Sequence, residues 1–153
     1  MTEETFQNEA RRLRPKMTAV ARRYTDHAAD AEDIVQDALL KLWLMHDDLQ
    51  SPPDGLAMVL TRNLSIDHQR KKKPHVPTPD IAEEESTEDE RIERMMRVIN
   101  TLPAKQQIIL RLRHMEGMKM CVIATLTAQT EAAVRKTLSR ARQEVLMKLN
   151  VER

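Results

Sequence analysis

The stretch from Ala31 to Trp43, AEDIVQDALLKLW, carries carboxylate and amide side chains with the type and spacing of a binding surface. Its apolar residues recur at helical spacing, and the acids that avoid this stripe are Glu32, Asp33 and Asp37. No base occurs in the stretch before Lys41. The pattern indicates a helix face shaped for a partner, although acids in the first turn also favour the helix dipole without any partner.

Basic side chains are concentrated in two places where they could contact phosphates or base edges. The segment DHQRKKK, residues 67–73, ends with four consecutive bases, which exceed what a helix C-terminus needs and indicate a phosphate-facing patch. The last predicted helix carries a second group off its apolar stripe, namely Arg135, Lys136, Ser139, Arg140 and Arg142. From the pattern alone, a DNA-reading surface and a solvated helix face are equally good interpretations of this second group.

No combination of residues indicates catalysis, metal binding or a cofactor. The five histidines are dispersed, and no nucleophile, base and orienting group occur together. The single cysteine, Cys121, excludes an internal disulfide, and with His114 it lacks the spacing of a zinc site. Cys121 lies in an apolar run and is expected to be buried. We therefore expect a protein that is not an enzyme and that uses no metal and no cofactor.

The binding residues must be positioned by helices. Only 2% of the 153 residues are aromatic and two are glycine, whereas the helix-favouring Leu, Met, Ala, Arg, Lys and Glu are abundant. No run approaches the roughly 18 apolar residues of a membrane span, and the N-terminal stretch lacks the apolar core of a secretory signal. The sequence predicts an all-α protein without membrane insertion, located in the cytoplasm.

The charge is divided unevenly along the chain. Residues 1–73 hold equal numbers of acids and bases, residues 74–90 hold seven acids and no base, and residues 91–153 hold 13 bases and five acids. The Pro-rich and acid-rich middle stretch has no apolar periodicity, so it has nothing to bury in return for the entropy of ordering. We expect two small helical domains, residues 1–73 and 91–153, joined by a flexible acidic linker over residues 74–90.

Helix-breaking and capping residues predict where the helices begin and end. Pro15 interrupts the first helical pattern and is expected to kink or split that helix. Asp30 is expected to cap the second helix, and Ser51, in SPPD, the third. Further along, Gly117 is placed to end a helix and Thr130 to cap the last one. Two helices joined by a short turn, the second of them basic, indicate a helix-turn-helix.

Four motifs in order, AEDIVQDALLKLW, TRNLSIDHQRKKK, LPAKQQIILRLRHMEG and AAVRKTLSRARQEV, resemble the sigma factors of bacterial RNA polymerase, in the small extracytoplasmic-function (ECF) group. The likeness covers nearly all of the chain except the acidic linker and the first few residues. It implies an N-terminal region 2 helical bundle that binds core polymerase and the −10 promoter element. It also implies a C-terminal region 4 helix-turn-helix that binds the −35 element.

The resemblance further implies roles for individual residues. The implied contacts to core polymerase come from Glu32, Asp33, Gln36 and Asp37. Those to −10 DNA come from Arg62, Asn63, Asp67, Arg70, Lys71 and Lys72. Those to −35 DNA come from Arg135, Lys136, Ser139 and Arg140. Trp43, in contrast, is expected to pack inside.

Two departures from the family pattern fall in the helix-turn-helix. Residues 126–129 read Leu-Thr-Ala-Gln where relatives show an Ile-Leu-Gly-Ile type turn, so a non-glycine residue is expected at a position that favours positive φ. Lys119 stands where a capping serine is common. Both changes are expected to weaken or alter the turn, and with it the −35 contacts.

The resemblance implies a monomer when free, with core RNA polymerase, double-stranded promoter DNA and an anti-sigma protein as partners. Two other classes stay open. A stand-alone dimeric helix-turn-helix transcriptional regulator would form a stable homodimer and bind a palindromic site. A pure interaction protein would use the acidic helix and the basic domain to bind proteins only, and would leave no DNA footprint with polymerase present.

Overall fold

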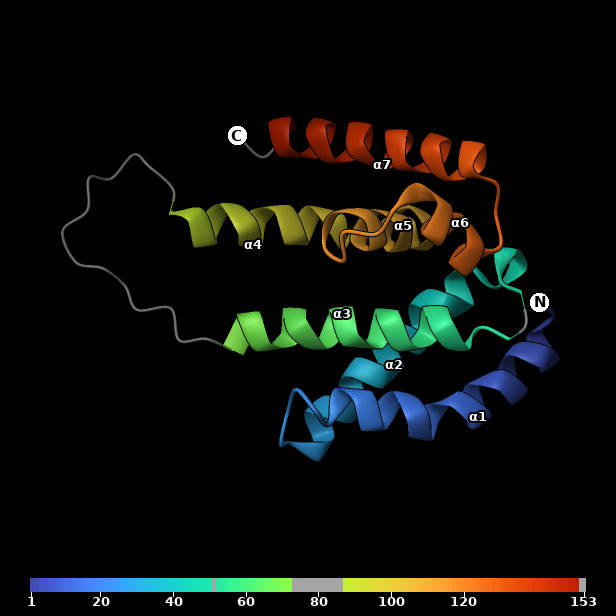
Figure 1. Cartoon of the computed structure of the whole chain (residues 1–153). Helices are drawn as coiled ribbons and strands as arrows, with labels where there is room; N and C mark the ends of the chain where they lie inside the picture. The colour runs from blue at the N-terminus through green and yellow to red at the C-terminus, as the bar shows by residue number, and fades with distance from the viewer. Residues whose placement is uncertain (51, 73–86, 152–153) are drawn as a thin grey trace.

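The computed structural model of the chain describes residues 1–50, 52–72 and 87–151, and within these ranges every regular element is a helix (Figure 1). The all-α prediction is therefore confirmed. Most of the stretch predicted as a linker, and Ser51 with its predicted capping role, lie outside the described residues. The last four linker residues do not: Thr87 is the N-cap of α4, which begins at Glu88, so residues 88–90 belong to a helix.

The first three helices form an N-terminal unit in which each contacts the other two. They are α1 (Glu3–Ala21), α2 (Ala28–Leu44) and α3 (Asp54–Lys72), with the short 3₁₀ helix η1 (His46–Asp48) after α2. The apolar stripes predicted from the sequence face inward: Leu13 and Met17 of α1, and Val35 and Leu42 of α2, are at most 1% exposed. Burial of these stripes is the main stabilising term for such short helices.

The structure tests two predictions about helix boundaries in this unit. Of the kink or split expected at Pro15, the split does not occur, because α1 is one helix with an exposed Pro15 inside it. The second prediction is wrong. α2 begins at Ala28, with His27 as N-cap, so Asp30 lies inside the first turn instead of capping the helix. Two alanines with high helix propensity precede Asp30 and extend the helix toward its N-terminus. The carboxylate of Asp30 instead lies 3.4 Å from Nε2 of His68 on α3.

The C-terminal unit comprises α4 (Glu88–Ile99), α5 (Ala104–His114), α6 (Met120–Thr127) and α7 (Glu131–Val151). The long α7 contacts each of the other three helices, as Figure 1 shows along the top of the molecule. The hydroxyl of Thr87 caps α4, and the hydroxyl of Thr130 accepts a hydrogen bond from the amide of Ala133 at 3.1 Å. The predicted cap at Thr130 is therefore confirmed.

The turns around α6 also follow the sequence-based expectations. Gly117, just after α5, has φ of 67°, which suits a residue that ends a helix. Ala128, between α6 and α7, has φ of 57° and ψ of 41°, so a non-glycine residue does occupy a left-handed position. This conformation costs an L-residue roughly 1–2 kcal/mol. Lys119 precedes α6 and makes no side-chain cap, as expected.

The prediction that Cys121 is buried is wrong, because its side chain is exposed. α6 turns Ile123, Ala124 and Thr127 toward the core, and a residue two positions before Ile123 points to the opposite side of a helix. The apolar run around Cys121 therefore has an exposed side.

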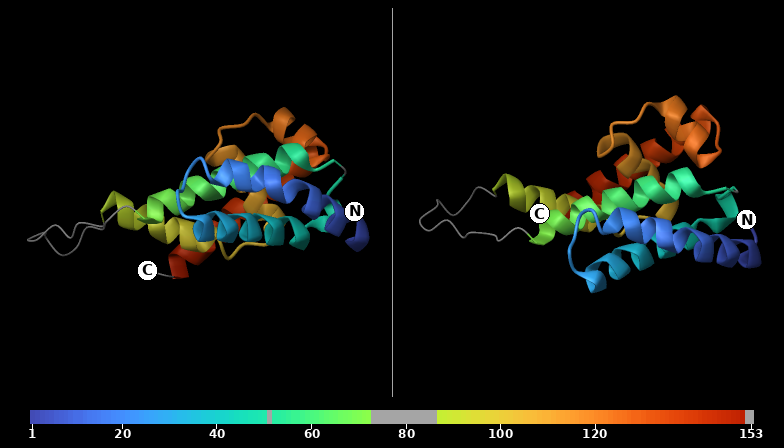
Figure 2. Two further views of the ribbon diagram at one scale, coloured as in Figure 1. Left: turned by 90° about the horizontal axis from the view of Figure 1, so that it is seen from below. Right: turned by 60° about the horizontal axis from the view of Figure 1, so that its bottom comes forward.

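The two units pack against each other, which the sequence did not predict. α5 lies against α2, and α6 lies against the start of α3, where a Cβ added to Gly55 would come within 2.9 Å of Leu126 Cδ1 (Figure 2). α3 thus contacts α1 and α2 of its own unit and α6 of the other unit. Its buried hydroxyls on Thr61 and Ser65 donate to the carbonyl oxygens of Ala57 and Thr61, each at 2.7 Å, which satisfies them inside the packed helix.

Candidate protein-binding and nucleic-acid interfaces

The acidic face of α2 consists of four exposed side chains: Glu32, Asp33, Gln36 and Asp37. The amide of Gln36 donates to the carboxylate of Glu32 at 3.3 Å, and Nζ of Lys41 lies 3.4 Å from the carboxylate of Asp37. Because Glu32 and Gln36, like Asp37 and Lys41, are one helical turn apart, these are local contacts within the helix. The four side chains stay exposed, although Asp33 and Asp37 also line a pocket that Asn100 and Arg111 of the C-terminal unit border.

Two exposed leucines extend the acidic face toward the C-terminus of α2, and the sequence analysis did not identify them as binding residues. Leu40 is 54% exposed and Leu44 is 66% exposed. Leu40 follows Asp33 by seven residues and Leu44 follows Asp37 by seven, so each lies two helical turns along the same side. A signal was available in the sequence, because neither leucine fits the buried stripe formed by Ala31, Ile34, Val35, Ala38, Leu39 and Leu42.

Trp43 lies between this surface and the core. It is half-buried, with its ring centroid 5.4 Å from that of Phe6 and 4.1 Å from that of His46, onto which it stacks. The Nδ1 atom of His46 is 2.7 Å from the carbonyl oxygen of Trp43, which fixes the start of η1. Trp43 thus packs against the core, as the sequence analysis expected, and it anchors the end of α2.

The six residues predicted to bind −10 DNA do not form one exposed surface. All six lie on α3, and Arg62, Arg70 and Lys71 are exposed, while the side chain of Lys72 is not described. Asn63 is only 4% exposed and Asp67 only 9%. The tertiary structure therefore divides this group into an exposed basic end and a covered middle.

Arg111 of α5 is the residue that covers the middle of α3. It is 1% exposed, and its Nη1 donates to the side-chain oxygens of Asn63 at 2.7 Å and Asp67 at 2.5 Å. Its Nη2 donates to Asn100 Oδ1 at 2.7 Å, at the C-terminal end of α4. A buried guanidinium requires both a counter-charge and hydrogen-bond acceptors, and Asp67 with the two asparagines supplies them.

Glu116, in the turn after α5, makes a second set of contacts beside Arg111. Its carboxylate pairs with Arg62 and accepts a hydrogen bond from the amide of Asn63 at 3.1 Å. The side chain of Glu116 is only 4% exposed, whereas that of Arg62 is 50% exposed. The sequence analysis missed both Arg111 and Glu116, although Arg111 follows Ile108 by three residues in a stripe of otherwise inward apolar side chains.

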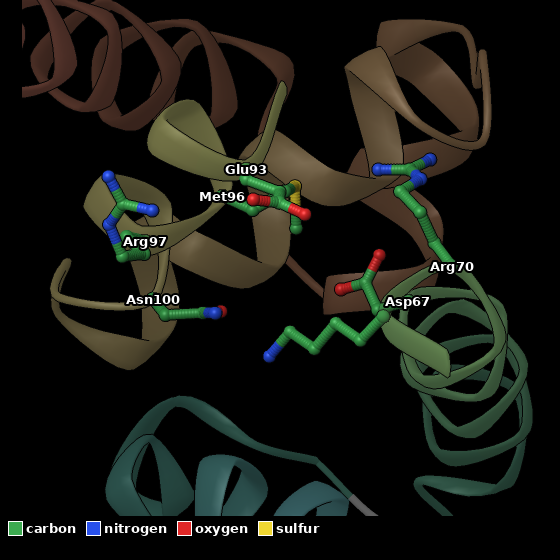
Figure 3. A pocket seen from close by; sticks show the side chains of 7 residues that line it. Asp67, Arg70, Glu93, Met96, Arg97 and Asn100 are labelled. Carbon is green, nitrogen blue, oxygen red and sulfur yellow. The ribbon is translucent and has the colours of Figure 1, made fainter. Parts of the chain in front are cut away.

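A cavity of about 200 Å³ lies next to this contact, between the end of α3 and α4 (Figure 3). Asp67 and Arg70 line it from α3, while Glu93 and Arg97 line it from α4. Its walls carry both signs of charge, so it offers no preference for an anion or a cation. It marks the outer edge of the contact between the two units.

The predicted −35 residues lie together on α7. Arg135, Lys136, Ser139 and Arg140 are all exposed, away from the buried stripe of Val134, Leu138, Ala141 and Val145. The helix-turn-helix formed by α6 and α7 thus presents a basic helix to solvent. Behind it, Nε of Arg142 lies 3.2 Å from Nε2 of His114, and burial together with Arg142 and Arg113 lowers the pKa of this histidine.

The described residues include no helix that is long and apolar enough to span a bilayer. Within the same ranges, no three His, Cys, Asp or Glu side chains gather as ligands of a metal ion would. The features that stand out are therefore surfaces: the acidic face, the basic end of α3 and the basic face of α7.

Comparison with known proteins relates these surfaces to a family. The family described as Sigma-70 region 2 matches residues 10–75, and that described as Sigma-70, region 4 matches residues 92–145. "Probable RNA polymerase sigma factor RfaY" of Xanthomonas campestris pv. campestris is 33% identical over 147 residues, which cover 84% of this chain and 36% of RfaY. "ECF RNA polymerase sigma factor SigJ" of Mycobacterium tuberculosis is 30% identical over 150 residues, covering 87% of this chain and 47% of SigJ.

Among solved structures, the sigma factor RpoE of Bartonella quintana, in complex with the anti-sigma factor NepR, aligns with a TM-score of 0.43 at 22% identity over 98% of this chain and 99% of that chain. The chain spans less than half the length of the two curated relatives named above. The two sigma-70 regions follow each other in the family's order and together match most of the residues. The chain therefore belongs to the sigma-70 family of RNA polymerase sigma factors, in its ECF group.

Proposed function

We propose that this protein is an alternative-sigma transcription initiation factor, which binds core RNA polymerase and directs it to promoters with −10 and −35 elements. The observation that carries the proposal is the succession of sigma-70 regions 2 and 4 along the chain, with an acidic face on the first and a basic exposed helix on the second. Sigma factors as a family are not enzymes, and the described surfaces suit binding rather than catalysis.

The acidic face of α2 is the proposed docking surface for core polymerase. Charges at the rim of an interface speed and orient association, while apolar side chains at its centre supply most of the affinity. Asp33 and Asp37 provide the charge, and the exposed Leu40 provides an apolar contact within the same stripe. The partner that fits this surface is a basic helical segment with its own apolar positions.

Promoter recognition is assigned to two separate basic surfaces. On α7, arginines such as Arg135 and Arg140 can bond two acceptors on the major-groove edge of guanine, while Lys136 and Ser139 suit phosphates. On α3, Arg70 and Lys71 form the exposed part of the proposed −10 surface. Each surface offers few phosphate contacts, so neither is expected to bind tightly alone, and polymerase makes the second contact effectively intramolecular.

The proposal includes a monomeric free protein in the cytoplasm and an anti-sigma protein as a further partner. It is tested by run-off transcription with purified core polymerase and genomic promoter fragments. Transcripts that depend on the added protein, and that disappear with the double variant Asp33→Lys, Asp37→Lys, are expected. A stable homodimer that binds a palindromic site without polymerase would instead support a stand-alone helix-turn-helix regulator, and binding to proteins without any DNA footprint would support a pure interaction protein.

A further inference from the structure

The C-terminal ends of α1 and α3 lie together at one end of the N-terminal unit. The two helices contact each other and run in the same direction, so their last turns meet (Figure 1). Nε2 of Gln69, near the end of α3, donates to the carbonyl oxygen of Tyr24, just after α1, at 3.1 Å. Gln69 precedes Arg70 in the chain, and Tyr24 follows Arg23. The bond therefore brings bases of both helices to the same end of the unit.

Four exposed bases form a patch at this end, the α1–α3 basic patch. Arg22 and Arg23 directly follow α1, while Arg70 and Lys71 lie in the last turn of α3. None of the four makes an ion pair or a side-chain hydrogen bond with another residue in the described part of the chain. Arg70 and Lys71 also line the cavity of Figure 3 together with Glu93, whereas the two bases after α1 do not.

Capping of α1 does not require the two arginines that follow it. Basic side chains near the C-terminus of a helix commonly bond its last carbonyl oxygens. Here the carbonyl oxygens of Thr18, Val20 and Ala21 accept backbone amides from the turn that follows α1. The carbonyl oxygen of Tyr24 accepts the side chain of Gln69. The guanidinium groups are therefore available to a partner.

DNA phosphates are the anionic partner that fits this patch. Like charges that lie close together repel each other, and an anionic partner relieves this repulsion. Arg70 and Lys71 already belong to the proposed −10 surface, so the patch continues that surface onto α1. A transcribing polymerase separates the strands from the −10 element toward the start site. The double-stranded DNA next to the element therefore lies upstream, toward the −35 element.

We propose that Arg22 and Arg23 bind the phosphates of the double-stranded DNA directly upstream of the −10 element. The proposal rests on the function proposed above, and it extends the −10 surface to a second helix. Phosphate contacts fix the position of a protein on DNA but carry no sequence information. The two arginines thus strengthen promoter binding equally on promoters with different spacer sequences.

The salt dependence of promoter binding counts these contacts. Holoenzyme is assembled from core polymerase and the full chain, and its affinity for a promoter fragment that it transcribes is measured at several salt concentrations. Each phosphate contact contributes about 0.9 to the slope of log affinity against log salt concentration. Arg22→Ala, Arg23→Ala is expected to reduce this slope by roughly 1–2 and to weaken binding on the order of tenfold. The loss is expected to be the same for different spacer sequences.

Two matched variants separate a phosphate contact from a general effect of charge. Arg11→Ala, Arg14→Ala removes the same charge from exposed positions roughly 12–16 Å before Arg22 along α1. This control is expected to keep the wild-type slope. Arg22→Lys, Arg23→Lys retains both charges and is expected to retain most of the slope. Affinity for core polymerase, measured without DNA, is expected to be unchanged in all three double variants.

A chelate that cleaves nearby DNA locates the patch. Cys121 is the only cysteine of the chain, so Cys121→Ser leaves a background in which one new cysteine can be labelled. Asp26→Cys places an iron chelate at an exposed position shortly after Arg23 and keeps both arginines. Asn8→Cys, exposed near the start of α1, is the control. Cleavage within the double-stranded spacer next to the −10 element is expected from position 26 and not from position 8.

Each result supports or overturns the phosphate contact. An unchanged slope for Arg22→Ala, Arg23→Ala would overturn it, and so would an equal loss in the Arg11→Ala, Arg14→Ala control. A loss of affinity for core polymerase with an unchanged slope would assign the arginines to a protein interface instead. If the alanine pair lowers the helical circular dichroism signal, cleavage from position 26 decides the question.

Failure of the proposed function gives a different result. In that case the wild-type protein neither binds core polymerase nor supports transcription. Cleavage of plain duplex DNA by the free labelled protein at low salt then judges the patch. Stronger cleavage from position 26 than from position 8 supports a phosphate-binding surface, whereas equal or weaker cleavage overturns it.

Discussion

Arg12 of α1 and Asp54 at the start of α3 form a two-pronged ion pair, with Nη1 2.9 Å from Oδ2 and Nη2 2.5 Å from Oδ1. The pair joins the first and third helices of the N-terminal unit. Hydrogen bonds from Arg12 lower the pKa of Asp54 from 3.8 to about 2. Arg12 also pairs with Glu9 one turn earlier, which restrains its side chain in this position.

The pair predicts a specific acid sensitivity. Because the folded-state pKa of Asp54 lies below its ordinary value, the pair stabilises the fold fully above about pH 3.8, and this stabilisation is lost as the pH falls through about 2. Asp54→Asn should lower the melting temperature slightly at neutral pH, and the difference from wild type should disappear only below pH 2, where Asp54 of the wild type is protonated in the folded state as well. Thermal unfolding followed by circular dichroism measures both values, and a constant difference across this range would contradict the prediction.

The lowered pKa of His114 leads to a second prediction, that the melting temperature also depends on pH in a higher pH range. Its pKa is lowered from 6.5 by burial and by the nearby Arg142 and Arg113, so the neutral form is favoured in the folded state. The stability that depends on neutral His114 is present above pH 6.5 and is lost as the pH falls through the lowered folded-state pKa. His114→Gln should therefore reduce the fall in melting temperature between pH 7 and pH 5. NMR titration of the histidine ring gives its pKa directly, and a value above 6.5 would contradict the assignment.

The exposed leucines of α2 predict a loss of polymerase binding that does not depend on charge. Leu40→Ser or Leu44→Ser should weaken binding to core polymerase roughly tenfold, because burial of one leucine contributes about 1.5–3 kcal/mol and 1.4 kcal/mol is a factor of ten. Leu146→Ser is the matched control, since Leu146 on α7 is 62% exposed and lies outside this surface. Fluorescence anisotropy with labelled protein measures the three affinities. Equal affinities for the two α2 variants and the control would show that the leucines are not part of the docking surface.

The turn before α7 predicts a stabilising substitution. Ala128→Gly should raise the free energy of unfolding by about 0.5–1 kcal/mol, because relief of the left-handed strain exceeds the added entropy of the unfolded chain. Ala132→Gly, at an exposed position inside α7, should lower it by roughly 1 kcal/mol. Urea unfolding of the two variants gives opposite changes if Ala128 is strained, and changes of the same sign if it is not.

The local features of this fold could be predicted from the sequence. The apolar stripes of α1, α2 and α7, the cap at Thr130 and the non-glycine turn at Ala128 depend on residues within one or two helical turns of each other. Helical periodicity and capping chemistry act over such short distances, so the pattern of residues carries them. The exposure of the acidic face of α2 and of the basic face of α7 follows from the same periodicity.

Other outcomes depended on how the two units pack, and the sequence patterns did not predict them. The burial of Asn63 and Asp67 is decided by Arg111, which is 48 and 44 residues away in the chain. No local pattern specifies which face of α3 meets α5, because that choice depends on the shape and charge of two separately formed units. The sequence by itself thus determined which helices form and which sides they bury among themselves. Only the tertiary structure decided which polar side chains of α3 remain available, because an ion pair between distant residues exists only after the units meet.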